Sequence, residues 1–135
     1  MPSVLPDPRA KNRANPAETS PEVFELAALV RRCMDDRSFA AVLVEKFTTR
    51  LPVTIREIES SLAASDWAAA AAKVHNLKGE AGSLAAGGLQ AAAAKLEESL
   101  RGAEHDAAPS LLVQLKSAAD ECVAARATAV ECLSG

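Results

Sequence analysis

Apolar positions recur at steps of three and four residues along several segments of the chain. Such steps gather side chains on one face of an α-helix, so each segment is predicted to be an amphipathic helix. The segment before residue 63 carries Val44, Phe47, Leu51, Ile55, Ile58 and Leu62. Its register continues through Pro52 without a change of phase. Pro52 is therefore expected to kink this helix, or to split it into two stacked helices, rather than open a loop.

The segment 66–89 is rich in alanine and contains His75. Asp66 suits a helix N-cap because its carboxylate can accept from the first free amides, and alanine has the highest helix propensity. One face, expected to be buried, holds Trp67, Ala70, Val74, Leu77, Ala81 and Leu84; the polar side holds Asn76, Glu80 and Ser83. His75 lies away from the apolar face, so we expect it at the surface.

Two later segments repeat the pattern. The first carries Leu89, Ala93, Leu96 and Leu100, with Lys95, Glu97, Glu98 and Arg101 expected to face water and Gly102 as C-cap. After a predicted loop at 103–108, Pro109 suits the start of a last helix. Its predicted apolar stripe is Leu111, Leu115, Ala118, Cys122, Ala125, Ala129 and Cys132.

The N-terminal part of the chain is predicted to add one short helix. Thr19, Ser20, Pro21 and Glu22 form a helix start, and the helix is expected to end near Cys33. A polar break at 34–37 follows, with Ser38 as the next cap. Residues 1–18 contain four prolines and no apolar period, so a flexible tail is predicted there, with the bundle domain over 19–135.

These elements predict an all-α fold, an up-down-up-down antiparallel four-helix bundle with an additional short N-terminal helix. A length of 135 residues suits one domain with one core. The net charge of −3 argues against nucleic-acid binding, because no basic stripe is available to replace phosphate counterions. The sequence has no apolar run of membrane-spanning length and no signal-peptide pattern, so a cytoplasmic protein is expected.

Three cysteines, Cys33, Cys122 and Cys132, are dispersed along the chain. They form no C-x-x-C pair, and zinc would need more ligands than the two dispersed histidines supply. We expect buried free thiols, because Cys122 and Cys132 fall on the predicted apolar stripe.

The neighbours of His75 on the helix surface are small: Ala68, Ala71, Ala72, Gly79 and Gly82. A glycine in a helix interior costs about 1 kcal/mol relative to alanine. The glycines therefore indicate a need other than helix stability, and close approach of a second macromolecule to the histidine meets it. Lys78, one turn along, offers a flexible positive charge to an anion held on the ring.

The string His75-Asn76-Leu77-Lys78-Gly79 resembles the H-x-L-K-G signature of histidine-containing phosphotransfer (HPt) domains. The resemblance extends from about residue 24 to the C-terminus and includes an apolar residue at Leu89. One position departs from the family pattern: Ala85 stands where the family usually has glycine, and the glycines come later, at 87 and 88. The family pattern therefore does not determine the residue at which the histidine helix ends.

The resemblance implies a phosphoryl carrier rather than an enzyme. His75 would be the phosphoacceptor, Lys78 would stabilise charge, and Gly79, Gly82, Ala71 and Ala72 would form a docking window. Partners would be response-regulator receiver domains, with a hybrid histidine kinase as a further candidate. The chain would need no cofactor of its own, because Mg²⁺ is expected in the receiver, and a monomer is expected.

Two other functions are alternatives. A histidine kinase needs an ATP-binding domain and a glycine-rich phosphate loop, for which the chain is too short. A non-catalytic bundle that docks receivers without carrying phosphate fits the same helices, but would have no need of an exposed histidine next to a lysine. His105, in the predicted polar loop, is expected to have no role.

Overall fold

The computed structural model describes residues 22–102 and 104–134. Within these ranges it contains five α-helices, one short 3₁₀ helix and no strand. The elements are α3 (Leu26–Arg32), α4 (Arg37–Ala63), α5 (Trp67–Ser83), α6 (Gly87–Arg101), η1 (His105–Ala107) and α7 (Ala108–Ser134). The prediction of an all-α fold is confirmed, and the predicted tail lies outside the described residues.

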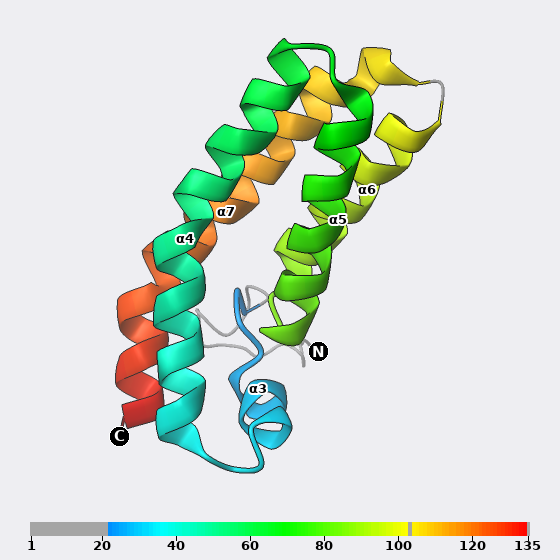
Figure 1. The fold of residues 1–135 in the computed structure, drawn as a ribbon. Helices are drawn as coiled ribbons and strands as arrows, with labels where there is room; N and C mark the ends of the chain where they lie inside the picture. The colour runs from blue at the N-terminus through cyan, green and yellow to red at the C-terminus, as the bar shows by residue number, and fades with distance from the viewer. Residues whose placement is uncertain (1–21, 103, 135) are drawn as a thin grey trace, which may run out of the picture.

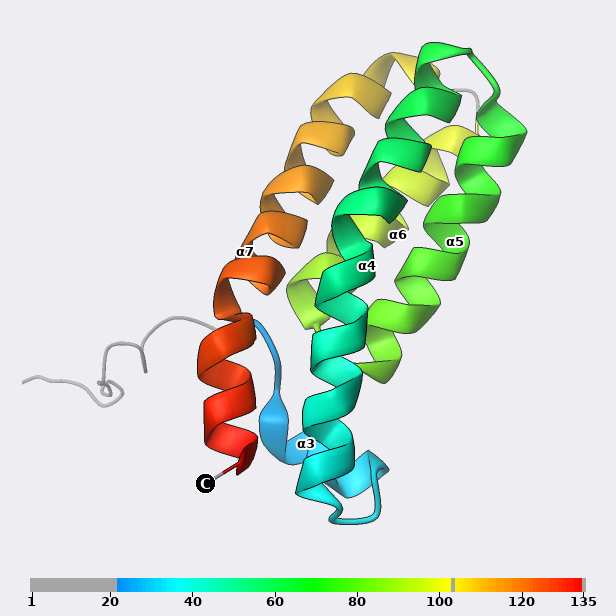
Figure 2. The ribbon, with the colours of Figure 1, turned by 60° about the vertical axis from the view of Figure 1, so that its left-hand side comes forward.

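The four long helices lie side by side, with α4 beside α7 and α5 beside α6 (Figures 1 and 2). The α4–α5 and α6–α7 connections lie at one end, and the α5–α6 turn lies toward the other (Figure 1). There α4 and α7 extend beyond α5 and α6, and α3 lies beside the extended part of α4. The N-terminal segment is tied to the α5–α6 turn because the Glu25 amide donates to the Ala85 carbonyl at 2.9 Å.

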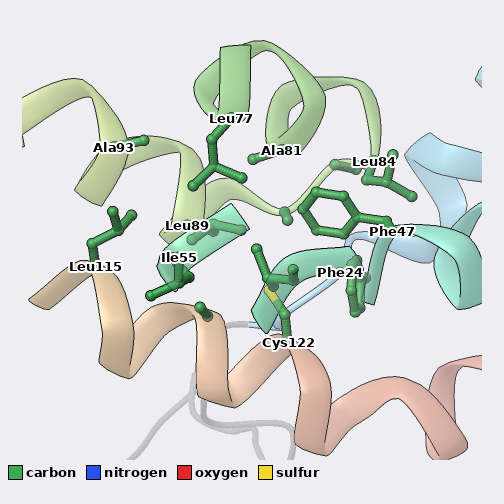
Figure 3. Close-up of a cluster of buried hydrophobic side chains, with 14 of the residues drawn as sticks. Phe24, Phe47, Ile55, Leu77, Ala81, Leu84, Leu89, Ala93, Leu115 and Cys122 are labelled. Carbon is green, nitrogen blue, oxygen red and sulfur yellow. The ribbon is translucent and has the colours of Figure 1, made fainter. Parts of the chain in front are cut away.

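All four long helices contribute apolar side chains to one core (Figure 3). The predicted stripes are confirmed at most positions, including the fully buried Val44, Leu51, Ile58, Val74, Leu77, Leu96 and Leu115. In α7 Leu115, Cys122 and Ala129 are buried as predicted, but Ala119 and Leu133 are buried where Ala118 and Cys132 were predicted.

Two of the three predicted buried thiols are confirmed. Cys33 and Cys122 are buried, and loss of hydration raises the pKa of the Cys122 thiol to about 12. Cys132 is exposed, and the prediction for it is wrong. The core takes the neighbouring Leu133 instead, which is four residues after the buried Ala129 and therefore lies on the same helix face.

Helix starts differ from the predictions at two places. Helix α3 begins at Leu26 rather than near Glu22, and the preceding Phe24 is buried in the core outside the helix; the predicted start at 19–21 lies outside the described residues. Helix α4 is capped by Asp36 rather than Ser38, because the Asp36 carboxylate accepts from the Phe39 amide at 3.0 Å. The predicted Asp66 cap of α5 is confirmed, with a bond of 3.2 Å from the Ala69 amide.

Pro52 lies inside a continuous α4 of 27 residues, so the expectation that it opens no loop is confirmed, and the alternative of two separate helices is excluded. A proline costs the helix one backbone hydrogen bond, to the carbonyl four residues earlier. Apolar burial on both sides of it, at Leu51 and Ile55, holds the helix together.

The turn between α5 and α6 uses Ala85 in the left-handed conformation, with φ of 59°. Helix α5 ends at Ser83, and the Ala86 amide donates back to the Ala81 carbonyl at 2.8 Å, a pattern that favours glycine at position 85. Ala85 therefore stands, at a cost of about 1 to 2 kcal/mol, where the HPt pattern has glycine. Gly87 and Gly88 begin α6 without positive φ and do not form the turn.

Candidate functional site

His75 lies on the middle of α5 with its side chain 58% exposed. Its Nδ1 atom is 2.9 Å from Glu97 Oε2 on the neighbouring helix α6. An ionised carboxylate can only accept, so Nδ1 carries the ring proton and donates it. The lone pair of the neutral ring is then on Nε2. The contact with Glu97 thus fixes both the tautomer and the orientation of the imidazole.

Glu97 is the centre of this site, and its side chain is only 9% exposed. Besides His75 it binds Lys78 Nζ, 2.7 Å from Oε1, and Arg101 Nε, 2.8 Å from Oε2. The Lys78 bond is the largest cause that lowers the pKa of Glu97 from 4.5 to about 2; burial opposes it, and Arg101 and His75 add to it. Glu97 is therefore ionised at neutral pH.

The prediction that Glu97 faces water is wrong. The sequence did hold one signal for its role, because Glu97 is four residues before Arg101 and four after the buried Ala93, at the edge of the α6 stripe. Its other partners come from α5, and they are brought to it only by the packing of α5 against α6.

The predicted site residues occupy different environments. Lys78 is one-third exposed and is engaged by Glu97 rather than free in solvent. Ala72 is exposed, but Ala71 is 2% exposed and packs in the core, so its inclusion in the docking window is wrong. Ala71 lies beside Ala70 and Val74 on the buried face, and its small side chain allows close helix packing there.

The two glycines near His75 also differ. A Cβ atom added to Gly79 would meet no atom within 4 Å, so nothing within the described fold requires glycine there. A Cβ atom at Gly82 would lie 2.6 Å from Gln90 Nε2, the end of a flexible side chain. The fold therefore gives no internal reason for Gly79, whereas Gly82 has an internal neighbour.

A surface hollow between α4 and α5 opens next to His75; we call it the α4–α5 hollow. Phe47 and Leu84 are buried and form its apolar base, and the exposed Lys46 and Arg50 stand on its α4 side. The lining residues are Leu43, Lys46, Phe47, Arg50, His75, Asn76, Gly79, Glu80, Ser83 and Leu84.

His105 has a structural contact that the sequence did not predict. It lies in η1, within the predicted loop, and its ring stacks on Trp67 with centroids 4.5 Å apart. Its Nε2 atom is 3.2 Å from the Leu100 carbonyl. His105 thus helps to close the α6–α7 connection over the start of α5, and its imidazole is not placed with His75.

The fold and the site together define a helical bundle that presents one carboxylate-held histidine at a surface hollow. The Hpt domain family model matches residues 42–125, more than half of the chain, and the chain therefore belongs to the Hpt domain family. This confirms the resemblance seen in the sequence. Comparison with curated proteins gives no match, and comparison with solved structures gives none either.

Hpt domains serve histidine phosphotransfer in phosphorelays, where they work with receiver domains and kinases as phosphocarrier modules rather than as catalysts. The match begins inside α4 and ends inside α7, so it spans α5, α6 and the whole His75 site. Within the part of the chain that the structure describes, none of the helices combines the length and the hydrophobicity that a membrane span requires.

Proposed function

We propose that this chain accepts a phosphoryl group on His75 from a receiver-domain aspartate and passes it to another receiver domain in a two-component phosphorelay. The observation that carries the proposal is the bond from Nδ1 of the exposed His75 to the nearly buried Glu97. It leaves Nε2 as the nucleophile, because Nδ1 is occupied by its proton.

The transfer step follows from this geometry. The Nε2 lone pair attacks phosphorus while the bond from phosphorus to the aspartyl oxygen breaks, and that electron pair returns to the aspartate carboxylate. The ring gains positive charge as the new N–P bond forms, and the Nδ1–H bond to Glu97 strengthens in response. Transfer to the second receiver is the same step in reverse. In-line positioning and charge neutralisation are the main demands of such a step.

Lys78 stabilises charge in this proposal through Glu97. A phosphoryl group on His75 carries negative charge close to the Glu97 carboxylate, and two anions in one site repel each other. Lys78 and Arg101, both within 2.8 Å of that carboxylate, offset its charge. The site can then hold an oriented imidazole without repelling the incoming phosphoryl group.

The partner docks over the α4–α5 hollow and over Gly79, Gly82 and Ala72 in this proposal. The receiver supplies its aspartate and its bound Mg²⁺, and this chain supplies no cofactor. We further propose that the long helices form an up-down-up-down bundle with α3 appended at its N-terminal side. A cytoplasmic location and a monomeric state stay predictions from the sequence.

The decisive experiment offers the purified protein two phosphoryl donors. We expect no label from ATP and rapid label from a phosphorylated receiver domain. His75→Gln abolishes this label, and His105→Gln, checked by circular dichroism because of the Trp67 stack, retains it. The label is lost in acid and survives alkali, as a phosphoramidate does, whereas an acyl phosphate does not survive alkali.

Two results would contradict the proposal. Autophosphorylation from ATP would support a histidine kinase. Tight receiver binding without an acid-labile label on His75 would support the second candidate, a bundle that docks receivers without carrying phosphate.

A further inference from the structure

Two cations of α4 share the α4–α5 hollow with His75. Lys46 and Arg50 are four residues apart and so lie on one face of α4, and both line the same hollow as the histidine. Both residues are exposed. Neither belongs to the H-x-L-K-G string, and the proposed function has so far given them no role.

Arg50 makes only a weak, exposed ion pair in this structure. Its guanidinium lies 3.4 Å from Glu80 Oε2, and the two side chains are 69% and 43% exposed. An exposed ion pair of this kind contributes little, because water and salt screen it. A phosphoryl group with two negative charges in the same hollow would compete with the single charge of Glu80. Lys46, one turn away, has a long flexible side chain that can reach in the same direction.

One cation of α5 and one of α6 are engaged on the Nδ1 side of the ring. Lys78 and Arg101 both bind Glu97, which holds Nδ1, whereas the phosphoryl group is bonded to Nε2. The charged groups around the modified ring are therefore Lys78 and Glu80 from α5, Glu97 and Arg101 from α6, and Lys46 and Arg50 from α4. Among the groups just named, Lys78 and Arg101 each have a carboxylate oxygen within 2.8 Å. Lys46 and Arg50 have no carboxylate that close among the same groups.

Resting on the proposed function, we propose that Lys46 and Arg50 neutralise the phosphoryl group carried on His75. The hollow brings both cations to the side of the ring where the Nε2 substituent must lie. A nearby positive charge favours the doubly ionised phosphoryl group over the singly ionised one, so these residues lower its second pKa. Phosphorylation also moves Arg50 from Glu80 toward the phosphoryl group.

The experiment needs no receiver. The protein is labelled with phosphoramidate, a small-molecule donor, and the phosphohistidine signal is titrated by ³¹P NMR; the absence of this signal from His75→Gln assigns it to His75. In the double variant Lys46→Gln/Arg50→Gln we expect the phosphoryl pKa to rise by about 0.5 unit or more. Arg50→Lys, with Lys46 unchanged, keeps both positive charges. We expect its phosphoryl pKa to stay close to that of the unsubstituted protein.

Two matched variants sharpen the result. Glu80→Gln, which removes the competing negative charge from the same hollow, is expected to lower the phosphoryl pKa. The double variant Arg56→Gln/Lys95→Gln removes the same net charge from exposed positions outside the hollow and is expected to leave the phosphoryl pKa unchanged. A shift equal to that of Lys46→Gln/Arg50→Gln would mean a general charge effect and would overturn the proposal.

The remaining outcomes are also decisive. An unchanged phosphoryl pKa in Lys46→Gln/Arg50→Gln, with slower receiver transfer, would make the two cations docking residues only. Failure of phosphoramidate to label His75 would contradict both this inference and the proposed function. Normal labelling and the expected pKa shifts, with no transfer from any phosphorylated receiver, would overturn the proposed function alone.

Discussion

The two sides of His75 are built differently. On the α6 side, Glu97 is nearly buried and makes three contacts of 2.7 to 2.9 Å, with His75, Lys78 and Arg101. On the α4 side, the cations Lys46 and Arg50 are exposed along an open hollow, and the nearest ion pair is 3.4 Å long. One ring nitrogen is therefore fixed by the protein, while the other is left accessible.

This difference matches what a phosphoryl carrier needs. A nucleophile is most effective when its orientation and proton are set before the partner arrives, because ordering them later costs free energy. A carrier must also admit a donor and then an acceptor, so the reacting side has to stay open. Short buried contacts meet the first need, and exposed flexible side chains meet the second.

The largest effect is expected when the Glu97 carboxylate, which holds His75 on the α6 side, is removed. Glu97→Gln removes the charge-assisted partner of Nδ1 and leaves Lys78 and Arg101 without their carboxylate. Loss of about 1.5 to 3 kcal/mol for such a bond predicts about ten- to a hundredfold slower phosphotransfer. Transfer from a phosphorylated receiver is measured by rapid quench, and Glu98→Gln, its exposed neighbour, is the matched control. Equal rates for both variants would show that Glu97 does not orient the ring.

Glu97 also shows where prediction from sequence stops. The apolar periods predicted the long helices, most of the core and the exposed position of His75, because those depend on spacing within one helix. Burial of a carboxylate depends on cations from another helix, and spacing within α6 cannot show them. The Trp67–His105 stack was missed for the same reason, since it joins the start of α5 to η1.

Local competition explains the other errors. Asp36 and Ser38 can both cap a helix, and only the structure shows that Asp36 accepts the Phe39 amide. Ala71 is a small residue that suits either a docking surface or a tight helix contact, and packing places it in the core. In α7, alanines and apolar residues stand on several faces, so the sequence did not distinguish Cys132 from Leu133 as the buried residue.

The next largest effect is expected at Gly79, which lines the α4–α5 hollow beside His75. Gly79→Gln places a long side chain where a Cβ atom meets nothing within 4 Å. We expect receiver-dependent transfer to slow about tenfold through misplacement of the partner, and stability to rise by about 0.5 kcal/mol because glycine is a poor helix former. Labelling by phosphoramidate, a small donor, stays unchanged. Gly88→Gln, at an equally open position at the start of α6, is the control; unaltered transfer in Gly79→Gln would remove the clearance argument.

A smaller effect is expected from removing Lys78, one of the two cations that bind Glu97. Lys78→Ala leaves Arg101 to offset Glu97, so only part of the neutralising charge is lost. We expect transfer to slow about fivefold, equivalent to about 1 kcal/mol, while His75 can still be labelled. Transfer rates and the lifetime of the phosphorylated protein are measured beside Lys95→Ala, an exposed lysine on α6. The same rates and lifetimes in both variants would make Lys78 an ordinary surface lysine.

The contacts of Glu97 should also affect the stability of the protein in acid. The pKa of Glu97 is lower in the folded state than its ordinary value of 4.5, so its contribution is present above pH 4.5 and is lost as the pH falls toward about 2. The loss is on the order of 1 to 2 kcal/mol after allowance for the part-exposed partners. Urea unfolding at several pH values measures it, and Glu97→Gln is expected to flatten this part of the profile. An equally steep profile in Glu97→Gln would assign the acid sensitivity to other carboxylates.

The smallest effect concerns the turn that sets α5 beside α6. Ala85 has φ of 59°, where glycine avoids a steric cost but loses more conformational entropy on folding. The two effects leave a net gain of about 0.5 kcal/mol for Ala85→Gly, measured by urea unfolding. Ala86→Gly, at a buried position with negative φ, is expected to destabilise instead, so the neighbouring variants differ in sign. Phosphotransfer is expected to be unchanged in Ala85→Gly, because the Glu97 contacts depend on helix packing; slower transfer would show that the strained turn itself holds Glu97 against His75.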